Sequence, residues 1–265
     1  MSRDGGPGRL AWLHFRVSVM NEMQYRVNFF VQLAQSVVWL GSGLVVLALV
    51  FSRTDDISGW TRPELLAVMG VFTLMGGVIR AFIQPAMQRL LTDVREGTLD
   101  FVLTRPADAQ LLVSVREMRI WQVLDILIGA GVLAVAVTQL EATVGLGDAL
   151  AFAALLVTGA VMIYCCWLII STGAFWLVRM ENVQELFDGV YRAGQYPITI
   201  YPGWLRAGLT FVIPLGFAIT APSQAITSRL SGGTVAVGAV TAAALVVVSR
   251  AFWRVGIRHY AGASA

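Results

Sequence analysis

Six long runs of apolar residues divide the chain, separated by stretches that contain charged residues, Gly or Pro. Because a helix needs about 20 mostly apolar residues to cross a membrane, these runs predict an all-α, polytopic membrane protein with one transmembrane domain. We expect the spans at residues 28–51, 64–84, 120–140, 150–178, 205–220 and 234–252. The fifth run is short and contains Pro214, which removes a backbone hydrogen bond and kinks a helix.

Two further segments combine helical apolar spacing with charges, so we do not expect them to span. Residues 9–26 carry Leu10, Leu13 and Val17 on one face, with arginines among the other residues. This pattern is typical of an amphipathic helix at the membrane surface, with a solvated helix as the alternative. Residues 181–192 have a similar apolar face and predict a second interfacial helix.

The composition agrees with a membrane protein and limits the possible functions. Hydrophobic residues make up 57% of the chain and charged residues 13%, against roughly 25% charged residues in an average soluble domain. The formal charge of +3 argues against a nucleic-acid-binding surface. All 19 basic residues are Arg. Because a Walker motif requires a Lys at the phosphates, the chain cannot itself be a Walker-type ATPase.

The arginines are distributed unequally between the two sides that alternating spans create. Only Arg53, Arg62 and Arg229 fall on one side, and the other 16 of the 19 fall on the opposite side, which includes both termini. Short cytoplasmic segments of membrane proteins are enriched in Arg and Lys. We therefore expect an even number of spans, with both termini in the cytoplasm.

Few side chains offer chemistry. His14 and His259 lie near opposite ends of the chain, and Cys165 and Cys166 are adjacent in an apolar run, where packing is the expected role. The sequence contains no recognisable catalytic or metal-binding motif. We expect no catalytic site, no metal site and no cofactor in this chain.

Two charged residues fall inside the expected spans, where a charge is costly. Arg80 is near the end of the second run, and Asp125 is near the start of the third. One hypothesis is that they form an ion pair between the two helices. The alternative is that each side chain extends to the lipid headgroups alone.

A polar stretch between the second and third runs is much longer than a turn requires. It covers residues 86–114 and includes REGTLDFVLTRPADAQLLVS, in which Gly97 permits a sharp turn and Pro106 limits helix continuation. Between them, Leu99 and Phe101 contribute to an apolar face, as in elements that dock into a groove of a soluble partner. A loop lying on the lipid surface is the alternative.

Two motifs resemble a known family. The order G-T-L-D-x-x-L-x-x-P followed by L-L, over residues 97–112, resembles the cytoplasmic segment of the type-2 ABC export permeases. Residues 195–226, QYPITIYPGWLRAGLTFVIPLGFAITAPSQAI, are similar to the fifth-span region of a bacterial six-span branch that often works as paired permeases. With the six apolar runs, the resemblance covers nearly the whole chain.

The resemblance implies the permease subunit of an ATP-driven exporter in the bacterial cytoplasmic (inner) membrane. It implies a second permease protomer, the same or homologous, and a separate ABC ATPase (nucleotide-binding) subunit dimer that carries ATP and Mg and contacts residues 86–114. Residues 181–192 are an expected secondary contact. On this basis we expect the ATPase interface at Glu96, Gly97, Leu99, Asp100, Phe101 and Pro106.

Pro202, Pro214 and Pro222 are expected to kink the fifth span near an external exit, or to have a purely structural role. Two other classes stay open at this point. A secondary carrier would act without an ATPase and would need buried ionisable sites, for which Arg80 and Asp125 are the candidates. A membrane-embedded enzyme would need a polar cluster that the sequence does not show. Drugs, lipids, peptides and glycan conjugates are all open as substrates.

Overall fold

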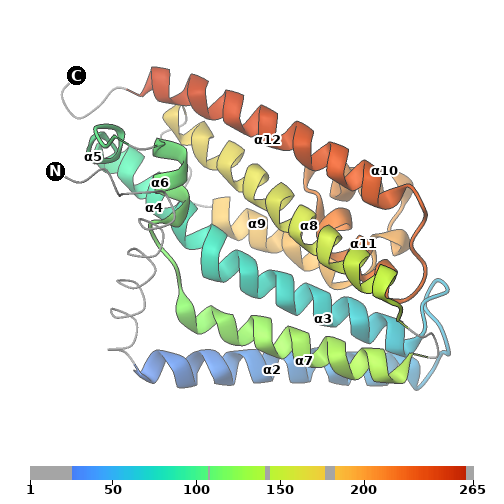
Figure 1. The fold of residues 1–265 in the computed structure, drawn as a ribbon. Helices are drawn as coiled ribbons and strands as arrows, with labels where there is room; N and C mark the ends of the chain where they lie inside the picture. The colour runs from blue at the N-terminus through green and yellow to red at the C-terminus, as the bar shows by residue number, and fades with distance from the viewer. Residues whose placement is uncertain (1–25, 107, 141–143, 177–182, 261–265) are drawn as a thin grey trace.

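The computed structural model describes residues 26–106, 108–140, 144–176 and 183–260. Within these ranges the chain is helical, with an isolated bridge between Ile57 and Trp60 and no strand. The chain is an all-α polytopic membrane protein, as the apolar pattern predicts (Figure 1). Among the described residues, five helical segments are long and apolar enough to cross a membrane: Val27–Phe51, Arg62–Glu96, Ile120–Gln139, Leu146–Phe175 and Thr234–His259.

The interfacial helix predicted at residues 9–26 lies outside the described residues, except for Arg26, which begins α2. The first, third, fourth and last of the five segments each consist of one helix or two consecutive helices. The first segment is α2 (Arg26–Phe51), the third is η2 (Ile120–Gln122) with α7 (Val123–Gln139), the fourth is α8 (Leu146–Thr172) with η3 (Gly173–Phe175), and the last is α12 (Thr234–His259).

The second segment is a continuous helical rod built of α3 (Arg62–Val78), the π-helical turn η1 (Ile79–Ile83) and α4 (Gln84–Glu96). Thr61 and Glu64 form a capping box at its start, where the Thr61 N–H donates to the Glu64 carboxylate at 2.7 Å. Such a box satisfies backbone donors that have no partner inside the helix. The rod extends beyond the predicted span and enters the polar region 86–114.

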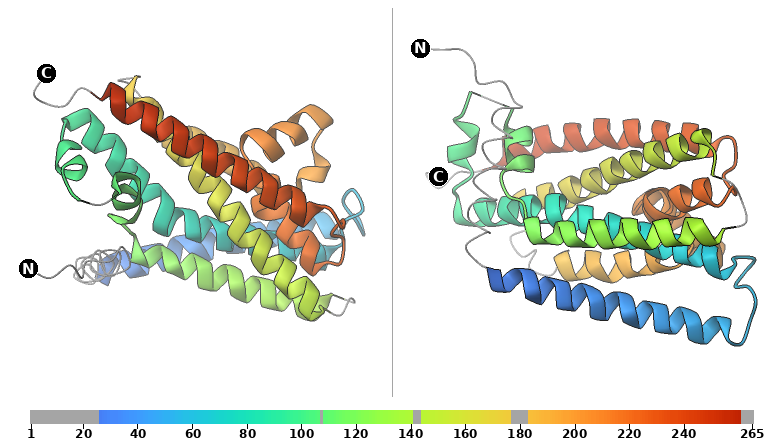
Figure 2. Two further views of the ribbon diagram at one scale, coloured as in Figure 1. Left: turned by 45° about the horizontal axis from the view of Figure 1, so that its top comes forward. Right: turned by 60° about the horizontal axis from the view of Figure 1, so that its bottom comes forward.

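The short helices α4, α5 (Asp100–Leu103) and α6 (Ala109–Val115) lie together at one end of the bundle (Figure 1). We call this end the α5 end and the opposite end the far end. The two side views agree that the start of α2 and the end of α12 also lie at the α5 end (Figure 2). The start of α2 and the end of α12 lie at the same end because the chain crosses the bundle an even number of times between them.

The helices α3 and α7 pack closely because glycines face each other across the contact. A Cβ added to Gly129 would lie 2.3 Å from the backbone N of Leu74, and one added to Gly70 would lie 2.8 Å from the backbone N of Leu133. Small residues allow the backbones of membrane helices to approach closely. This contact fixes α7 against the α3–α4 rod.

The segment predicted as a second interfacial helix instead packs one face into the bundle, through the buried side chains of Phe187 and Tyr191. Helix α9 (Val183–Arg192) is followed by η4 (Ala193–Gln195) and η5 (Ile198–Ile200). Gln88 of α4 donates to Gln184, whereas Trp60 Nε1, at the start of α3, donates to Thr199 Oγ1 at 3.0 Å. Residues 184–199 therefore extend from α4 to the start of α3, and in chain order they form the fifth crossing of the bundle, after α8 and before α12.

The predicted fifth span at residues 205–220 is not one helix. α10 (Gly203–Ala207) with η6 (Gly208–Val212) forms one half, and η7 (Gly216–Thr220) with α11 (Ala221–Ile226) forms the other, bent by 81° from the first. Both halves lie towards the far end (Figure 1). Because residues 184–199 already reach that end, the bent pair returns into the bundle as a re-entrant element.

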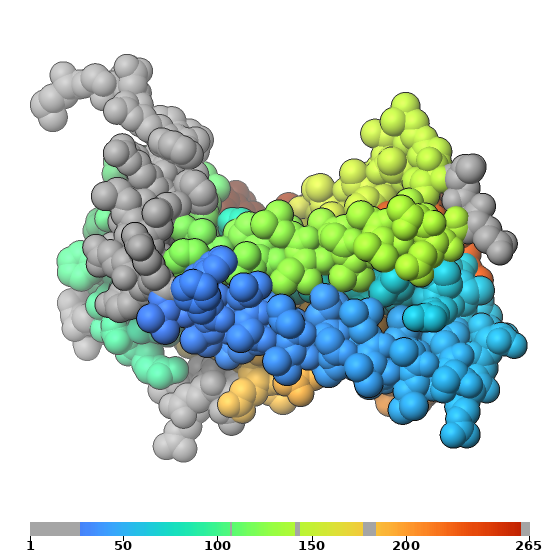
Figure 3. Space-filling model, turned by 90° about the horizontal axis from the view of Figure 1, so that it is seen from below, coloured from blue at the N-terminus to red at the C-terminus, as the bar shows by residue number. Residues whose placement is uncertain are grey.

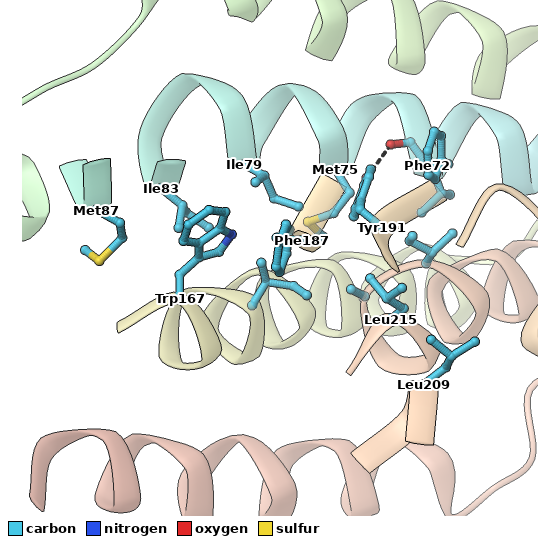
Figure 4. Close-up of a cluster of buried hydrophobic side chains, with 14 of the residues drawn as sticks. Phe72, Met75, Ile79, Ile83, Met87, Trp167, Phe187, Tyr191, Leu209 and Leu215 are labelled. Carbon is cyan, nitrogen blue, oxygen red and sulfur yellow. Dashed lines mark hydrogen bonds between the residues drawn. The ribbon is translucent and has the colours of Figure 1, made fainter. Parts of the chain in front are cut away.

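The core joins α3, α8, α9 and the bent pair (Figure 4). Trp167 of α8 and Phe187 of α9 have ring centroids 4.6 Å apart, and Phe72 of α3 stacks on Tyr191 at 4.6 Å. The Tyr191 hydroxyl donates to the Phe72 carbonyl at 2.7 Å. Burial of these rings explains why α9 packs into the bundle although its sequence contains several charged residues among the apolar ones.

Candidate functional site

The polar region at the α5 end begins with a sharp turn. Helix α4 ends at Glu96 and is followed by Gly97, which has a left-handed φ of 70°, and the Thr98 N–H donates to the Asp93 carbonyl at 2.9 Å. A left-handed residue after a helix is usually Gly because it has no Cβ. This turn redirects the chain from α4 into α5.

Asp93 holds the turn together and was not identified by the sequence analysis. Its carboxylate is buried and lies 2.6 Å from Arg116 Nη1 and 3.1 Å from Arg89 Nε, and it accepts a hydrogen bond from Thr98 Oγ1 at 3.0 Å. A buried carboxylate is stable when charged donors satisfy it. The i,i+4 spacing of Arg89 and Asp93 is a sequence signal, but the role of Arg116 depends on the fold.

Helix α5 divides the predicted interface residues between the core and the surface. Leu99 is 0% exposed, and its neighbour Phe101 is 74% exposed. Glu96 and Pro106 are exposed, and Asp100 is partly exposed. Leu99 is therefore a core residue that anchors α5 and not a contact for a partner, contrary to its predicted place in the interface. Phe101 is the large apolar side chain that α5 presents outward.

Two contacts connect this region to the membrane helices. Pro85 has no N–H, so the carbonyl of Ala81 four residues earlier lacks its usual helical donor, and the Arg119 N–H donates to that carbonyl at 2.9 Å. At the other contact, Arg250 of α12 donates to Asp108 Oδ1 at 2.9 Å. Movement of α5 and α6 is thereby linked to both the α3–α4 rod and α12.

Asp108 also begins α6. Its carboxylate accepts a hydrogen bond from the Leu111 N–H at 3.1 Å as a helix cap. Chiefly because Arg250 donates a side-chain hydrogen bond to it, the pKa of Asp108 is lowered from 3.8 to about 2. Asp108 is therefore ionised at neutral pH, and its pair with Arg250 is charged.

Arg80 and Asp125 are brought together, as one of the two sequence hypotheses expects. Arg80 Nη2 lies 2.8 Å from Asp125 Oδ2, and Arg80 Nε donates to Gln122 Oε1 at 3.2 Å. From α2, Gln32 donates to Asp125 Oδ2 at 3.3 Å and Ser36 donates to Oδ1. The ion pair neutralises the charge of the Asp125 carboxylate at the point where α2, η1 and α7 meet. The π-turn η1 carries Arg80, and such turns frequently occur at functional sites.

A cavity of about 270 Å³ borders this network. Seen from below, α2 forms the near layer, with α7 on one side of it and α9 visible on the other (Figure 3). The cavity lies between these helices and the rod. Its lining includes Gln32, Trp39, Phe72, Arg80, Asp188 and Arg192.

A second cluster lies at the far end. Arg229 Nη2 donates to Glu64 Oε2 at 2.9 Å and to the Gly59 carbonyl at 2.6 Å, and its guanidinium carbon lies 5.1 Å from the centre of the Trp60 ring. Arg229 thus fastens the segment after α11 to the start of α3.

The three prolines predicted as kinks have different positions. Pro214 lies in the break between the two bent halves, Pro202 precedes α10 as its N-cap, and Pro222 lies in the first turn of α11. Because α11 continues directly from η7, Pro222 removes an N–H inside a continuous helical segment, as Pro85 does where α4 continues from η1. Pro214 is the proline that coincides with a sharp bend.

The described residues contain no group of three or more His, Cys, Asp or Glu side chains that could hold a metal ion. Cys165 and Cys166 are buried and not bonded to each other. The arrangement offers a protruding, firmly anchored helix at one end and a polar cavity between membrane helices.

Comparison with known proteins agrees with this architecture. No curated protein and no solved structure matches the chain. A family model described as ABC-2 family transporter protein matches residues 37–264. The match includes the α5 region, Arg80, Asp125 and the bent pair. The chain therefore belongs to the ABC-2 transporter family and is a membrane permease component of an ABC transporter.

Proposed function

We propose that the chain is the permease subunit of an ATP-driven exporter and that α5 docks on a separate ATPase subunit. The observation that carries this proposal is the exposure of Phe101, a large apolar side chain of α5 that is 74% exposed. An aromatic anchor surrounded by polar groups is typical of a protein interface. Glu96 and Asp100, which are close to Phe101 in sequence, would supply charged groups of such an interface, together with the exposed Pro106.

The fixed geometry behind α5 suits mechanical coupling. Asp93 and the buried Leu99 attach α5 to α4, and α4 continues through η1 into α3. At 1.5 Å per residue, the 35 residues of the rod extend for about 50 Å. A displacement of α5 by an ATPase would therefore move the membrane part of the rod.

Coupling also requires that the partner make different contacts in two states, since proximity alone shifts no equilibrium. We propose that ATP and Mg bind to a partner ATPase dimer, and that closure of this dimer moves α5. A second permease protomer, the same or homologous, would complete the route for the substrate. The bend at Pro214 would then lie near the external exit.

The α5 end faces the cytoplasm of a bacterium in this proposal. Its exposed basic side chains support this orientation because cytoplasmic segments retain arginine, and the ATP that drives transport is cytoplasmic. The exposed arginines at or near this end include Arg95, Arg105, Arg119, Arg254 and Arg258.

The proposal is tested by introducing a charge at the exposed position of α5. Phe101→Asp should abolish co-purification of the ATPase subunit and the stimulation of its ATP hydrolysis, because a carboxylate would replace the apolar anchor. Leu146→Asp is the matched control, because Leu146 is 80% exposed at the far end. Unchanged ATPase binding by the Phe101 variant would refute the docking role of α5.

A further inference from the structure

The cavity beside Arg80 has two chemically different ends. Its polar end contains guanidinium, amide and carboxylate groups, including Arg80, Arg192 and Asp188. Its other end contains the aromatic residues Trp39 and Phe72. A ligand that matches both ends must itself be amphipathic.

The polar end exposes positive charge more than negative charge. The Asp125 side chain is only 6% exposed, because Arg80, Gln32 and Ser36 cover its carboxylate, whereas the Arg80 side chain is 38% exposed. Arg192, from α9, is also exposed. A ligand entering the cavity would therefore meet the guanidinium groups of Arg80 and Arg192, with the single carboxylate of Asp188, before it met Asp125.

The orientation of Arg80 is fixed from both sides. Its bonds to Asp125 and Gln122 hold one edge of the guanidinium. On the other side, a Cβ added to Gly76 would lie 3.0 Å from Arg80 Nη2 and 3.1 Å from Nη1. Gly76 thus leaves the space that the guanidinium fills. A guanidinium held in this way loses little entropy when it binds an oxyanion.

The aromatic end offers a flat apolar surface. The rings of Trp39 and Phe72 are stacked with centroids 5.3 Å apart and planes inclined by 19°. Phe72 is buried, but Trp39 is 38% exposed, so Trp39 is the ring that a hydrocarbon chain can contact.

From these features we propose that the cavity binds an amphiphile with a singly charged phosphate diester headgroup. The phosphate lies between Arg80 and Arg192, and the hydrocarbon chain lies along Trp39. Guanidinium groups bind phosphate oxygens through charge-assisted hydrogen bonds. Asp188, half-buried in the cavity lining, offsets one of these two positive charges, so the remaining single positive charge favours a monoanionic diester over a dianionic phosphate monoester.

The size of the cavity agrees with a headgroup. A volume of about 270 Å³ corresponds to about nine water molecules at about 30 Å³ each. The chain of the amphiphile would extend past Trp39 towards the lipid. This inference names a class of molecule that the permease recognises, and it depends on the proposed function only for the step from binding to transport.

Binding can be measured on the purified full chain in neutral detergent, without an ATPase. The probe is lysophosphatidylglycerol with a 12-carbon chain. Arg192→Gln should weaken its binding about tenfold, the effect of losing one charge-assisted contact. Arg254→Gln, which changes an exposed arginine of α12, should leave the dissociation constant unchanged.

A second variant tests the aromatic end without touching the charges. Trp39→Ala should weaken binding of the 12-carbon probe but not of a 6-carbon analogue, whose chain is too short to cover the ring. Equal losses for both chain lengths would show that Trp39 supports the fold and does not contact the chain.

Other probes decide the chemistry of the headgroup. Tighter binding of the phosphate diester than of a 12-carbon monoglyceride, of lysophosphatidylcholine and of inorganic phosphate supports the inference. Equal binding of the monoglyceride or lysophosphatidylcholine overturns the anion site, and equal binding of inorganic phosphate overturns the amphiphile. Phe101→Asp should bind the probe normally, so failure of this inference is distinguishable from failure of ATPase docking.

Discussion

The ion pair between Arg80 and Asp125 makes a quantitative and asymmetric prediction. Asp125 is nearly inaccessible, with 6% of its side chain exposed, whereas 38% of the Arg80 side chain is exposed. Removing Arg80 leaves a buried carboxylate without its cation, and breaking a buried pair in this way costs about 3–5 kcal/mol. Because Gln32 and Ser36 still donate to Asp125, we expect Arg80→Gln to cost about 3 kcal/mol.

Substitution of the other partner, Asp125, should cost less stability. Asp125→Asn keeps the shape of the side chain, and the exposed part of Arg80 can extend towards the headgroups. We expect a cost of about 1 kcal/mol, the net value of one hydrogen bond. In the double variant no charge stays buried, so it should be more stable than Arg80→Gln alone, with a coupling energy of about 2 kcal/mol.

The assay is reversible unfolding of the four proteins in mixed micelles with increasing sodium dodecyl sulfate, followed by tryptophan fluorescence. The double-mutant cycle isolates the interaction between Arg80 and Asp125 from the separate effect of each substitution. The pairing would be contradicted if the two single variants cost the same free energy and the double variant cost their sum. That result would show that each charge is accommodated independently.

Three further predictions concern packing and the α5 end. Gly129→Leu should separate α3 from α7 and lower the thermal unfolding midpoint in detergent by more than 5 °C, roughly the effect of 1–3 kcal/mol of overpacking; an unchanged midpoint would contradict the close contact. Asp93→Asn should leave Arg116 without its anion and cost about 2 kcal/mol, detectable as faster proteolysis at the α5 end; wild-type cleavage rates would argue against this role. The pKa of Asp108 is lowered in the folded state, so its stabilising pair with Arg250 is complete above about pH 4 and is lost as the pH falls through about 2. The difference in unfolding midpoint between wild type and Asp108→Asn should therefore shrink between pH 5 and pH 2, and a constant difference would exclude this linkage.

Long apolar runs predict most of the architecture because a membrane helix must satisfy its own backbone and cover it with apolar side chains. The fifth crossing shows the limit of this rule. Helix α9 contains Glu185, Asp188 and Arg192, and its charges are tolerated because some of them line a cavity. Residues 205–220 are apolar for a different reason, since much of the bent pair is buried against protein. Average hydropathy does not distinguish lipid contact from protein contact.

The position of the short helix α5 was predicted, but the burial of its side chains was not. Gly97 and Pro106 indicate a short element between turns, and the structure has α5 there. Which face of α5 points inward depends on tertiary contacts, because one helical turn has no periodicity to reveal it. Leu99 and Phe101 are both apolar in sequence, but only Phe101 is exposed. The contact of Asp93 with Arg116 joins residues 23 positions apart and follows from the fold alone.

The central claim is that α5 is the surface on which an ATPase subunit docks, and a thiol introduced at Phe101 tests it most directly. The native cysteines, Cys165 and Cys166, are buried, so a maleimide should label Phe101→Cys selectively. A Leu146→Cys variant supplies the matched control at the far end. We predict that the ATPase subunit slows labelling at position 101 at least tenfold and leaves labelling at position 146 unchanged. Equal labelling rates at position 101 with and without the ATPase would contradict the claim.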